Sequence, residues 1–231
     1  AILDVDGLVN LTVSGELALA QVTEAFASSA RYTAFKMGNV SISGSTANAS
    51  DFGLAGNLTI AGLDYNSAAA TFERLDWTSA FDFDDDAEAD VLNPGDDLPT
   101  PVDLSIDFDS GLELRVSGSV SGDSSNGDIF LEVGPVTLAG SAEFALTRQT
   151  LDVDIEGDGT IDDGTNDFLA AQLDSLAISV SGASLEVDGI GSLSVSGNLA
   201  LAQVTAAADS TPSYTALKMT DLIVSGSTAD G

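Results

Sequence analysis

Apolar and polar residues alternate along most of the chain with a period of two. Two apolar residues at alternating positions are followed by a glycine in the same phase, as in Leu11-x-Val13-x-Gly15. The glycines of this motif are Gly15, Gly44, Gly56, Gly118, Gly140, Gly182, Gly197 and Gly226. A period of two is typical of strands with one apolar and one polar face. The pattern therefore predicts an all-β fold with these glycines on the apolar face.

Glycine inside a strand lowers stability, so its recurrence in one phase needs a structural reason. We interpret each motif glycine as a bend or as a position where a neighbouring backbone or side chain packs closely across the sheet. Helical patterns are weak by comparison. Only residues 167–173 and 21–29 are candidates for one or two helical turns, and strand patterns flank both.

The chain contains a long internal repeat. Residues 1–49 align without a gap with residues 183–231, and 28 of the 49 positions are identical. Lys36, for example, returns as Lys218. The 182-residue spacing predicts one full repeat unit over residues 1–182 and the first quarter of the next over residues 183–231. Because the chain stops within a unit and does not begin with Met, we expect the parent protein to be longer.

Successive copies of the glycine motif follow one another with almost no linker between them. In repeat arrays each unit buries its faces against its neighbours, which favours one continuous body. We therefore expect an elongated antiparallel β repeat array or a β-solenoid. A string of tandem β-sandwiches is the alternative architecture.

The chain is strongly acidic, with 37 acidic and 6 basic residues and a net charge of −31. Such a charge repels phosphate backbones and anionic lipid surfaces, so we expect no nucleic-acid partner. No apolar run approaches the roughly 20 residues of a membrane helix, and we expect no membrane insertion. Cysteine is absent. Large secreted proteins often combine these features, as do acidic cytosolic proteins of halophiles, and we expect an extracellular or cell-surface location.

Two acidic segments interrupt the strand patterns, and both are candidate calcium sites. Two carboxylates about 4 Å apart repel by about 4 kcal/mol at an effective dielectric of about 20, so crowded ones need water, salt or a metal between them. The candidate ligands are Asp82, Asp84 and Asp86 in the first segment, and Asp152, Asp154, Glu156, Asp158, Asp162 and Asp163 in the second. In the alternative interpretation, both segments are solvated acidic loops.

In the second segment, acids alternate with glycines that permit a sharp turn around a hard cation. Asp154, Glu156 and Asp158 resemble the first three acidic positions of the EF-hand-type calcium loop, but Thr165 stands where that family has a bidentate acid. A frame that starts at Asp152 supplies the last acid as Asp163 and loses the apolar residue of the motif. Both frames remain open.

The usual catalytic groups are missing from the sequence. There is no His and no Cys, which removes the commonest general base and the thiol nucleophile. No phosphate-binding glycine loop or nucleophile elbow occurs. Polysaccharide-degrading β-solenoid enzymes use carboxylates together with Arg or Lys, whereas the six basic residues here are scattered along the chain. We expect the protein not to be an enzyme, with such a hydrolase as a distant alternative.

The alternation Leu193-Ser-Val195-Ser-Gly197, repeated at long period with Asp-rich loops, resembles the repeat regions of giant bacterial extracellular and cell-surface, adhesin-like proteins. The resemblance implies a role in adhesion, envelope structure or cell–cell contact. We expect a structural repeat segment of a large secreted or surface-attached protein that forms a filament, stalk or envelope layer and is stabilised by calcium. Its expected partners are adjacent repeats of the same protein, in a homopolymeric or fibrous assembly.

An adhesin module that binds a glycan or a cell surface is the alternative function. Aromatic side chains stack on sugars, and the candidates are Trp77, Tyr32, Tyr65 and Tyr214. Tyr32 and Tyr214 are the same position of the repeat, which leaves few independent stacking residues.

Overall fold

The computed structural model of the chain describes residues 2–5, 9–25, 30–46, 52–122, 129–133, 136–161, 167–188, 190–207 and 212–228. The elements in these ranges are strands and one short 3₁₀ helix, so the predicted all-β class is confirmed. Their bounds are β1 Ile2–Val5, β2 Val9–Thr23, β3 Arg31–Thr46, β4 Phe52–Ala68, η1 Pro94–Asp97, β5 Leu112–Gly122, β6 Ile129–Val133, β7 Val136–Val153, β8 Phe168–Val187, β9 Gly191–Thr205 and β10 Ser213–Thr228.

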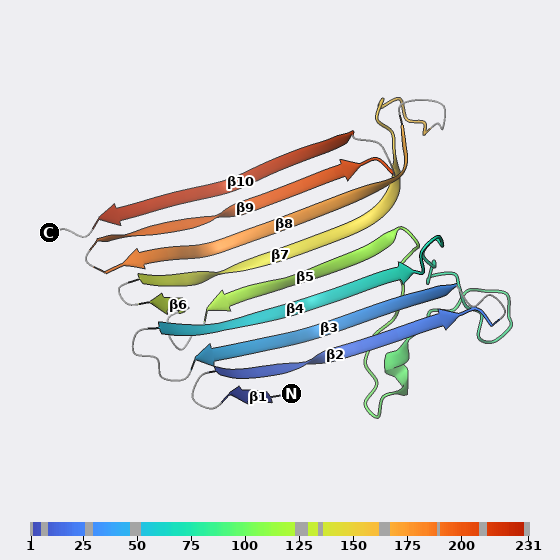
Figure 1. Cartoon of the computed structure of the whole chain (residues 1–231), viewed down its shortest axis with the longest axis horizontal. Coiled ribbons are helices and arrows are strands. Elements are labelled where there is room, and N and C mark those ends of the chain that lie inside the picture. Colours follow the sequence, from blue (N-terminus) through green and yellow to red (C-terminus); the bar gives the residue numbers. More distant parts are fainter. Residues whose placement is uncertain are drawn as a thin grey trace.

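All the strands belong to one antiparallel sheet (Figure 1). The spatial order is β1-β2-β3-β4-β5-β7-β8-β9-β10, so strands that are consecutive in the chain lie side by side. The short strand β6 pairs with both β4 and β7, and it continues the position of β5 in the sheet. The sheet is therefore extended along its hydrogen-bonding direction, with β1 and β10 at opposite edges.

The predicted alternation is confirmed by the cross-strand register, because directly opposed residues lie on the same face of a sheet. One such row crosses the sheet from β2 to β10 and is wholly apolar: Leu17, Met37, Leu63, Val116, Leu146, Leu176, Leu201 and Leu217. We call its side the apolar face. The adjacent row, on what we call the polar face, is Ala18, Lys36, Asp64, Arg115, Thr147, Ser175, Ala202 and Ala216.

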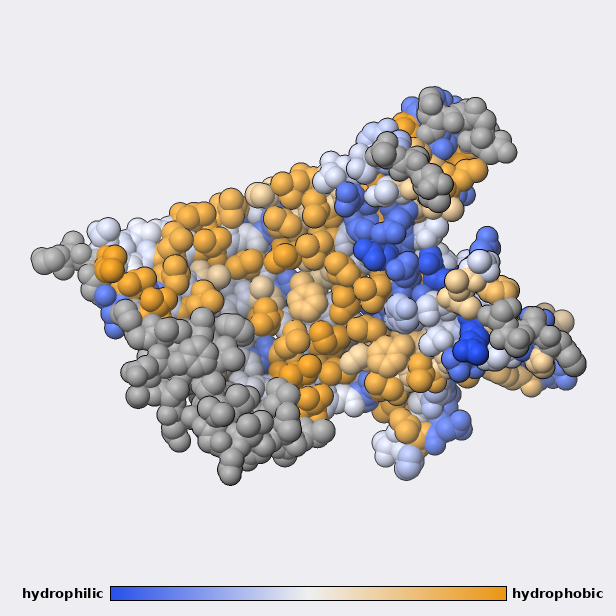
Figure 2. Space-filling view, in the orientation of Figure 1, coloured by the Kyte–Doolittle hydropathy of each residue, from blue (hydrophilic) through white to orange (hydrophobic). Residues whose placement is uncertain are grey.

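The apolar face is open to solvent over much of the sheet. Leu17 is 58% exposed, Leu19 63% and Leu217 58%. Figure 2 shows apolar side chains gathered over the central strands of this face, with hydrophilic residues toward one end. The alternation thus predicted which residues share a face, but in the described part of the chain no second layer packs on it.

The hydrophobic core lies on the opposite side, at one end of the sheet. There the β4–β5 segment (residues 69–111) packs on the polar face of β2 and β3. Its buried side chains Trp77, Ile106 and Phe108 cluster with Ala34 of β3 and Leu112 of β5. Because Trp77 has no exposed surface, its predicted role as a glycan-stacking residue is wrong.

Two motif glycines on β5 and β7 show the close approach that the sequence predicted. A Cβ on Gly118 would lie 2.1 Å from the Thr59 carbonyl oxygen of the next strand. On Gly140, whose φ of 127° is unfavourable for other residues, a Cβ would lie 2.6 Å from the Ala183 Cα. The register shifts next to Gly140, so this glycine marks a β-bulge.

The expected helical turns are absent where the structure can be compared. Residues 168–173 begin β8, and residues 21–23 end β2. Pairing with neighbouring strands overrides the weak local preference of these Ala-rich stretches. The only helix in the described ranges is the four-residue η1, and no helix there is long and apolar enough to cross a membrane.

Candidate functional site

The first acidic segment brings three exposed carboxylates together. Single oxygen atoms of Asp82, Asp84 and Asp86 all lie within 4.8 Å of one another. The Asp82 carboxylate accepts hydrogen bonds from the backbone N–H groups of Asp86 (3.2 Å) and Ala87 (3.0 Å). Asp85 adopts a positive φ of 61°, which tightens the turn. The arrangement offers converging oxygen ligands of the kind that a hard divalent cation takes.

In the second acidic segment, carboxylates accept hydrogen bonds from backbone N–H groups of their own loop. Asp154 accepts hydrogen bonds from the N–H groups of Gly157 (2.5 Å) and Gly159 (2.8 Å). Both glycines have positive φ, 73° and 88°. The Asp158 carboxylate accepts from the Thr160 hydroxyl (2.6 Å) and N–H (2.8 Å), and these bonds lower the pKa of Asp158.

The remaining predicted ligands of this segment are spread out. Asp152 accepts a hydrogen bond from the Ala170 N–H (2.7 Å), and Glu156 is exposed. Asp162 and Asp163 lie outside the described residues. Among the acids that the structure describes, only Asp82, Asp84 and Asp86 form a group of three at this spacing.

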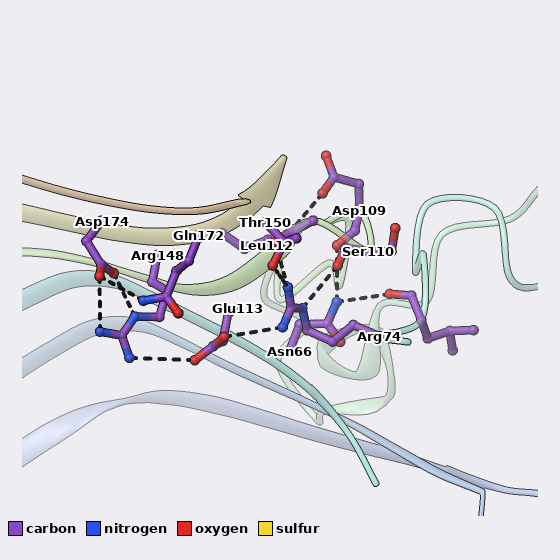
Figure 3. Close-up of polar contacts among 12 residues, drawn as sticks. Asn66, Arg74, Asp109, Ser110, Leu112, Glu113, Arg148, Thr150, Gln172 and Asp174 are labelled. Carbon is purple, nitrogen blue, oxygen red and sulfur yellow. Dashed lines mark hydrogen bonds and ion pairs between the residues drawn. The ribbon is translucent and has the colours of Figure 1, made fainter. Parts of the chain in front are cut away.

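Arg74 anchors the β4–β5 segment to the sheet (Figure 3). Its guanidinium donates to the backbone oxygens of Ser110 (3.0 Å) and Gly111 (3.1 Å), where the segment ends. It also donates to the Thr150 hydroxyl of β7 (2.6 Å) and pairs with Glu113 of β5 (3.2 Å). One side chain thus joins the start and the end of the segment to two strands.

A second arginine extends this network along the strands. Arg148 Nε lies 2.6 Å from Asp174 Oδ1, and Arg148 Nη1 lies 3.8 Å from Glu113 Oε1. Gln172 Nε2 donates to the Asp174 carboxylate at 2.8 Å. The hydrogen bond from Arg148 lowers the pKa of Asp174, and the same bond raises the pKa of Arg148. The pair ties β7 to β8 (Figure 3).

The buried Asn66 of β4 holds the core end of the segment. Its Nδ2 donates to the backbone oxygens of Leu75 (2.9 Å) and Asp109 (3.1 Å). Its Oδ1 accepts a hydrogen bond of 3.0 Å from the Trp77 indole. Since the amide and the indole are both fully buried, each would be costly without these partners.

Lys36 and Arg115 flank a buried acid on the polar face. Asp64 lies 2.6 Å from Arg115 Nη2 and 3.6 Å from Lys36 Nζ. Lys36 Nζ also lies 3.3 Å from Asp107 of the β4–β5 segment. Sequence reasoning missed these roles of the basic residues, because their partners are 26 to 76 residues away and no local motif marks them.

A cleft of about 750 Å³ opens beside the Arg74 anchor. Tyr65 and Phe72 line it and are 39% and 37% exposed, and the acids Glu73 and Asp152 lie on its wall. Of the other predicted stacking residues, Tyr214 is 52% exposed next to Phe168, and Tyr32 is partly buried against the core. Among the predicted stacking residues, Tyr65 is therefore the one that combines exposure with a cleft.

Comparison with known proteins adds no relative from which a role could be transferred. No family model, no curated protein and no solved structure matches the chain.

Proposed function

We propose that the chain is a structural repeat segment of a large secreted or surface-attached protein, and that its units join edge to edge into one long sheet. The observation that carries this proposal is the identical strand register of the two repeat copies. Val13 pairs with Ile42 in the first copy, and the equivalent Val195 pairs with Val224 in the second. A repeat that recurs at the same register within one sheet is suited to building length.

The N-terminal edge of the sheet supports the same growth. In the second copy, β8 pairs with β9 along its whole length, from Gly191 to Thr205. In the first copy, β1 pairs with β2 only over Val9–Thr12. This register is the same as that of the last four residues of β8 on β9. From Ser14 to Thr23, β2 pairs with no strand on that side within the described residues. A β8-type strand from a preceding unit would complete the pairing.

The open apolar face also favours an assembled protein over an isolated one. Soluble monomers rarely expose contiguous apolar patches larger than a few hundred Å². Here a row of apolar residues crosses the sheet from Leu17 to Leu217, and both ends are more than half exposed. The face is consistent with a filament, stalk or envelope layer, outside the cell, in which further protein covers it.

Electron microscopy of a tandem array tests the proposal. Four copies of residues 1–182 in one chain should form a straight or twisted ribbon of constant width, because each unit continues the sheet of the one before. Discrete beads joined by thin connections would contradict it and would favour tandem β-sandwiches.

We propose calcium as the stabilising cation, bound first by Asp82, Asp84 and Asp86. The converging carboxylate oxygens support this assignment. In a chain of net charge −31, a divalent ion would relieve the repulsion among these acids. The Asp152–Asp158 part of the second segment is a weaker candidate, since its described carboxylates do not converge as a group of three.

Glycan binding is a second candidate function, favoured by the cleft at Tyr65 and Phe72. Its aromatic rings and neighbouring carboxylates are groups that stack on sugar rings and accept hydrogen bonds from hydroxyls. A glycan array probed with the chain tests it. Binding that Tyr65→Ala abolishes would support an adhesive role, and no binding to any glycan would leave the structural role alone.

A further inference from the structure

The two copies of the repeated hairpin have the same backbone geometry. Ala20 pairs with Ala34 in the first copy, and the equivalent Ala202 pairs with Ala216 in the second. Both hairpins carry a bulge with a residue at positive φ at the same position of the repeat, 51° in the first copy and 55° in the second. Any difference in the surroundings of the two hairpins therefore comes from what packs on them.

The surroundings differ on the polar face. In the first copy, Ala18 and Ala34 are buried, because the β4–β5 segment packs on the hairpin. In the second copy, the equivalent Ala200 and Ala216 are exposed. Two adjoining hollows of about 440 and 330 Å³ extend across β7 to β10; Ala200 and Lys218 line both, and Ala216 lines the smaller one. We call these hollows the β9–β10 groove.

The lysine of the repeat shows the same contrast. Lys36 of the first copy pairs with Asp64 of β4 and with Asp107 of the β4–β5 segment. Its equivalent Lys218 is exposed and forms no ion pair among the described residues. Among the described residues, the groove therefore presents an unpaired lysine where the first copy has a lysine paired with two carboxylates.

The outer strand edges of the two copies differ as well. The outer edge of β3 pairs with β4 from Tyr32 to Ser45. β10 is the equivalent of β3 and is the last strand of the sheet, so its outer edge is unpaired within the described ranges. An exposed edge of this length is a ready template for another strand.

We propose that the β9–β10 groove and the edge of β10 bind a segment of the same kind as residues 52–111, supplied by the next repeat unit. This inference rests on the proposed function. Its strand pairs with β10 in the register of β4 on β3, and its Trp- and Ile-bearing loop covers Ala200 and Ala216. Carboxylates equivalent to Asp64 and Asp107 reach Lys218.

Several residues of β10 differ from their equivalents in β3, and one of these substitutions adds a side chain where the first copy has a glycine. Thr220 stands where the first copy has Gly38. A Cβ on Gly38 would lie 3.8 Å from Leu104 Cδ2, which is ordinary van der Waals contact. The backbone of the docked segment therefore needs no displacement to accept a Cβ there.

Cysteine labelling tests the inference, since the chain contains no cysteine of its own. The matched variants are Ala34→Cys and Ala216→Cys, made in the full chain and in the full chain followed directly by a second copy of residues 50–111. In the full chain, a maleimide should label Ala216→Cys at least about tenfold faster than Ala34→Cys. In the lengthened chain, labelling of Ala216→Cys should slow by at least about tenfold.

The outcomes separate this inference from the proposed function. Fast labelling of Ala216→Cys in the lengthened chain would overturn it, even if tandem arrays still form ribbons. Protection in the unextended chain that rises with protein concentration would also overturn it, because a second copy would then fill the groove. If Ala34→Cys fails to fold, Lys36→Cys and Lys218→Cys form a second matched pair. They allow the same comparison at positions with room for the thiol.

Discussion

Val40 packs directly over Gly15: a Cβ on Gly15 would lie 2.6 Å from both Val40 Cα and Val40 Cγ2. The repeat reproduces this contact, because a Cβ on Gly197 would lie 2.9 Å from the Leu222 Cα. Gly15 and Gly197 also share a φ near 149° and 146°, which other residues rarely adopt.

We expect Gly15→Val and Gly197→Val each to lower the free energy of unfolding by about 1–3 kcal/mol, through overpacking against the next strand and backbone strain. Gly62→Ala is the matched control, since a Cβ there meets only Ser117 Oγ at 4.0 Å. Urea denaturation measures all three. Equal stability of the valine variants and the control would show that the close approach does not constrain the sheet.

Removing the Asn66 amide should destabilise the core end of the sheet. Asn66→Ala leaves the Trp77 indole and two backbone oxygens without their partners, and we expect a loss of about 2–3 kcal/mol. Trp77 emission should shift to the red as water enters. Asn57→Ala, at an exposed position of the same strand, should change neither quantity. A wild-type unfolding curve for Asn66→Ala would refute the anchoring role.

The pH dependence of stability should report the Arg148–Asp174 pair. Because folding lowers the pKa of Asp174, the pair stabilises the protein above the ordinary Asp value of about 3.9. That contribution is lost as the pH falls through this value toward the lower folded pKa. The Tm difference between the wild type and Asp174→Asn should thus be constant from pH 7 to about 5 and shrink on further acidification. Glu143→Gln, at an exposed acid of β7, serves as control. A difference that persists unchanged at low pH would disprove this assignment.

Calcium should raise the Tm, and chelator should reverse the effect. At a calcium concentration about 100-fold above the dissociation constant, one site adds about 2.7 kcal/mol. Asp82→Asn combined with Asp84→Asn should remove most of this gain, whereas Asp154→Asn reports separately on the second segment. Magnesium should substitute poorly, since it requires a near-ideal octahedral shell. A Tm indifferent to both ions in calorimetry would leave the segments as solvated acidic loops.

The strands and the residues that share a face could be predicted, because they depend on local alternation. Leu193, Val195 and Leu199 share a face in β9, as a period of two requires. Which face of the sheet other parts of the chain pack on could not be predicted in the same way. The alternation predicts that the face of Leu17 is buried. Instead its neighbour Ala18 is buried, because the β4–β5 segment packs on the other face.

The anchor of that segment was likewise beyond sequence reasoning. Trp77 lies in a stretch without periodicity, so its burial depends on Asn66, a residue eleven positions earlier on a different element. Arg74 donates a hydrogen bond to Thr150, which lies 76 positions later in the chain. The acidic group at Asp82 was visible as a local pattern, but the hydrogen bond from Ala170 to Asp152 arises only once β7 and β8 are paired.

The increase in length per added unit tests the continuous sheet most directly. Six strand steps separate β2 from its copy β9, and neighbouring strands lie about 4.8 Å apart, so each 182-residue unit should add about 29 Å along the hydrogen-bonding direction. Small-angle X-ray scattering from chains with one, two and three further units should show the longest dimension rising by that constant step, with an unchanged cross-section. A longest dimension that grows by a larger, variable amount, as for compact units on flexible tethers, would contradict the account.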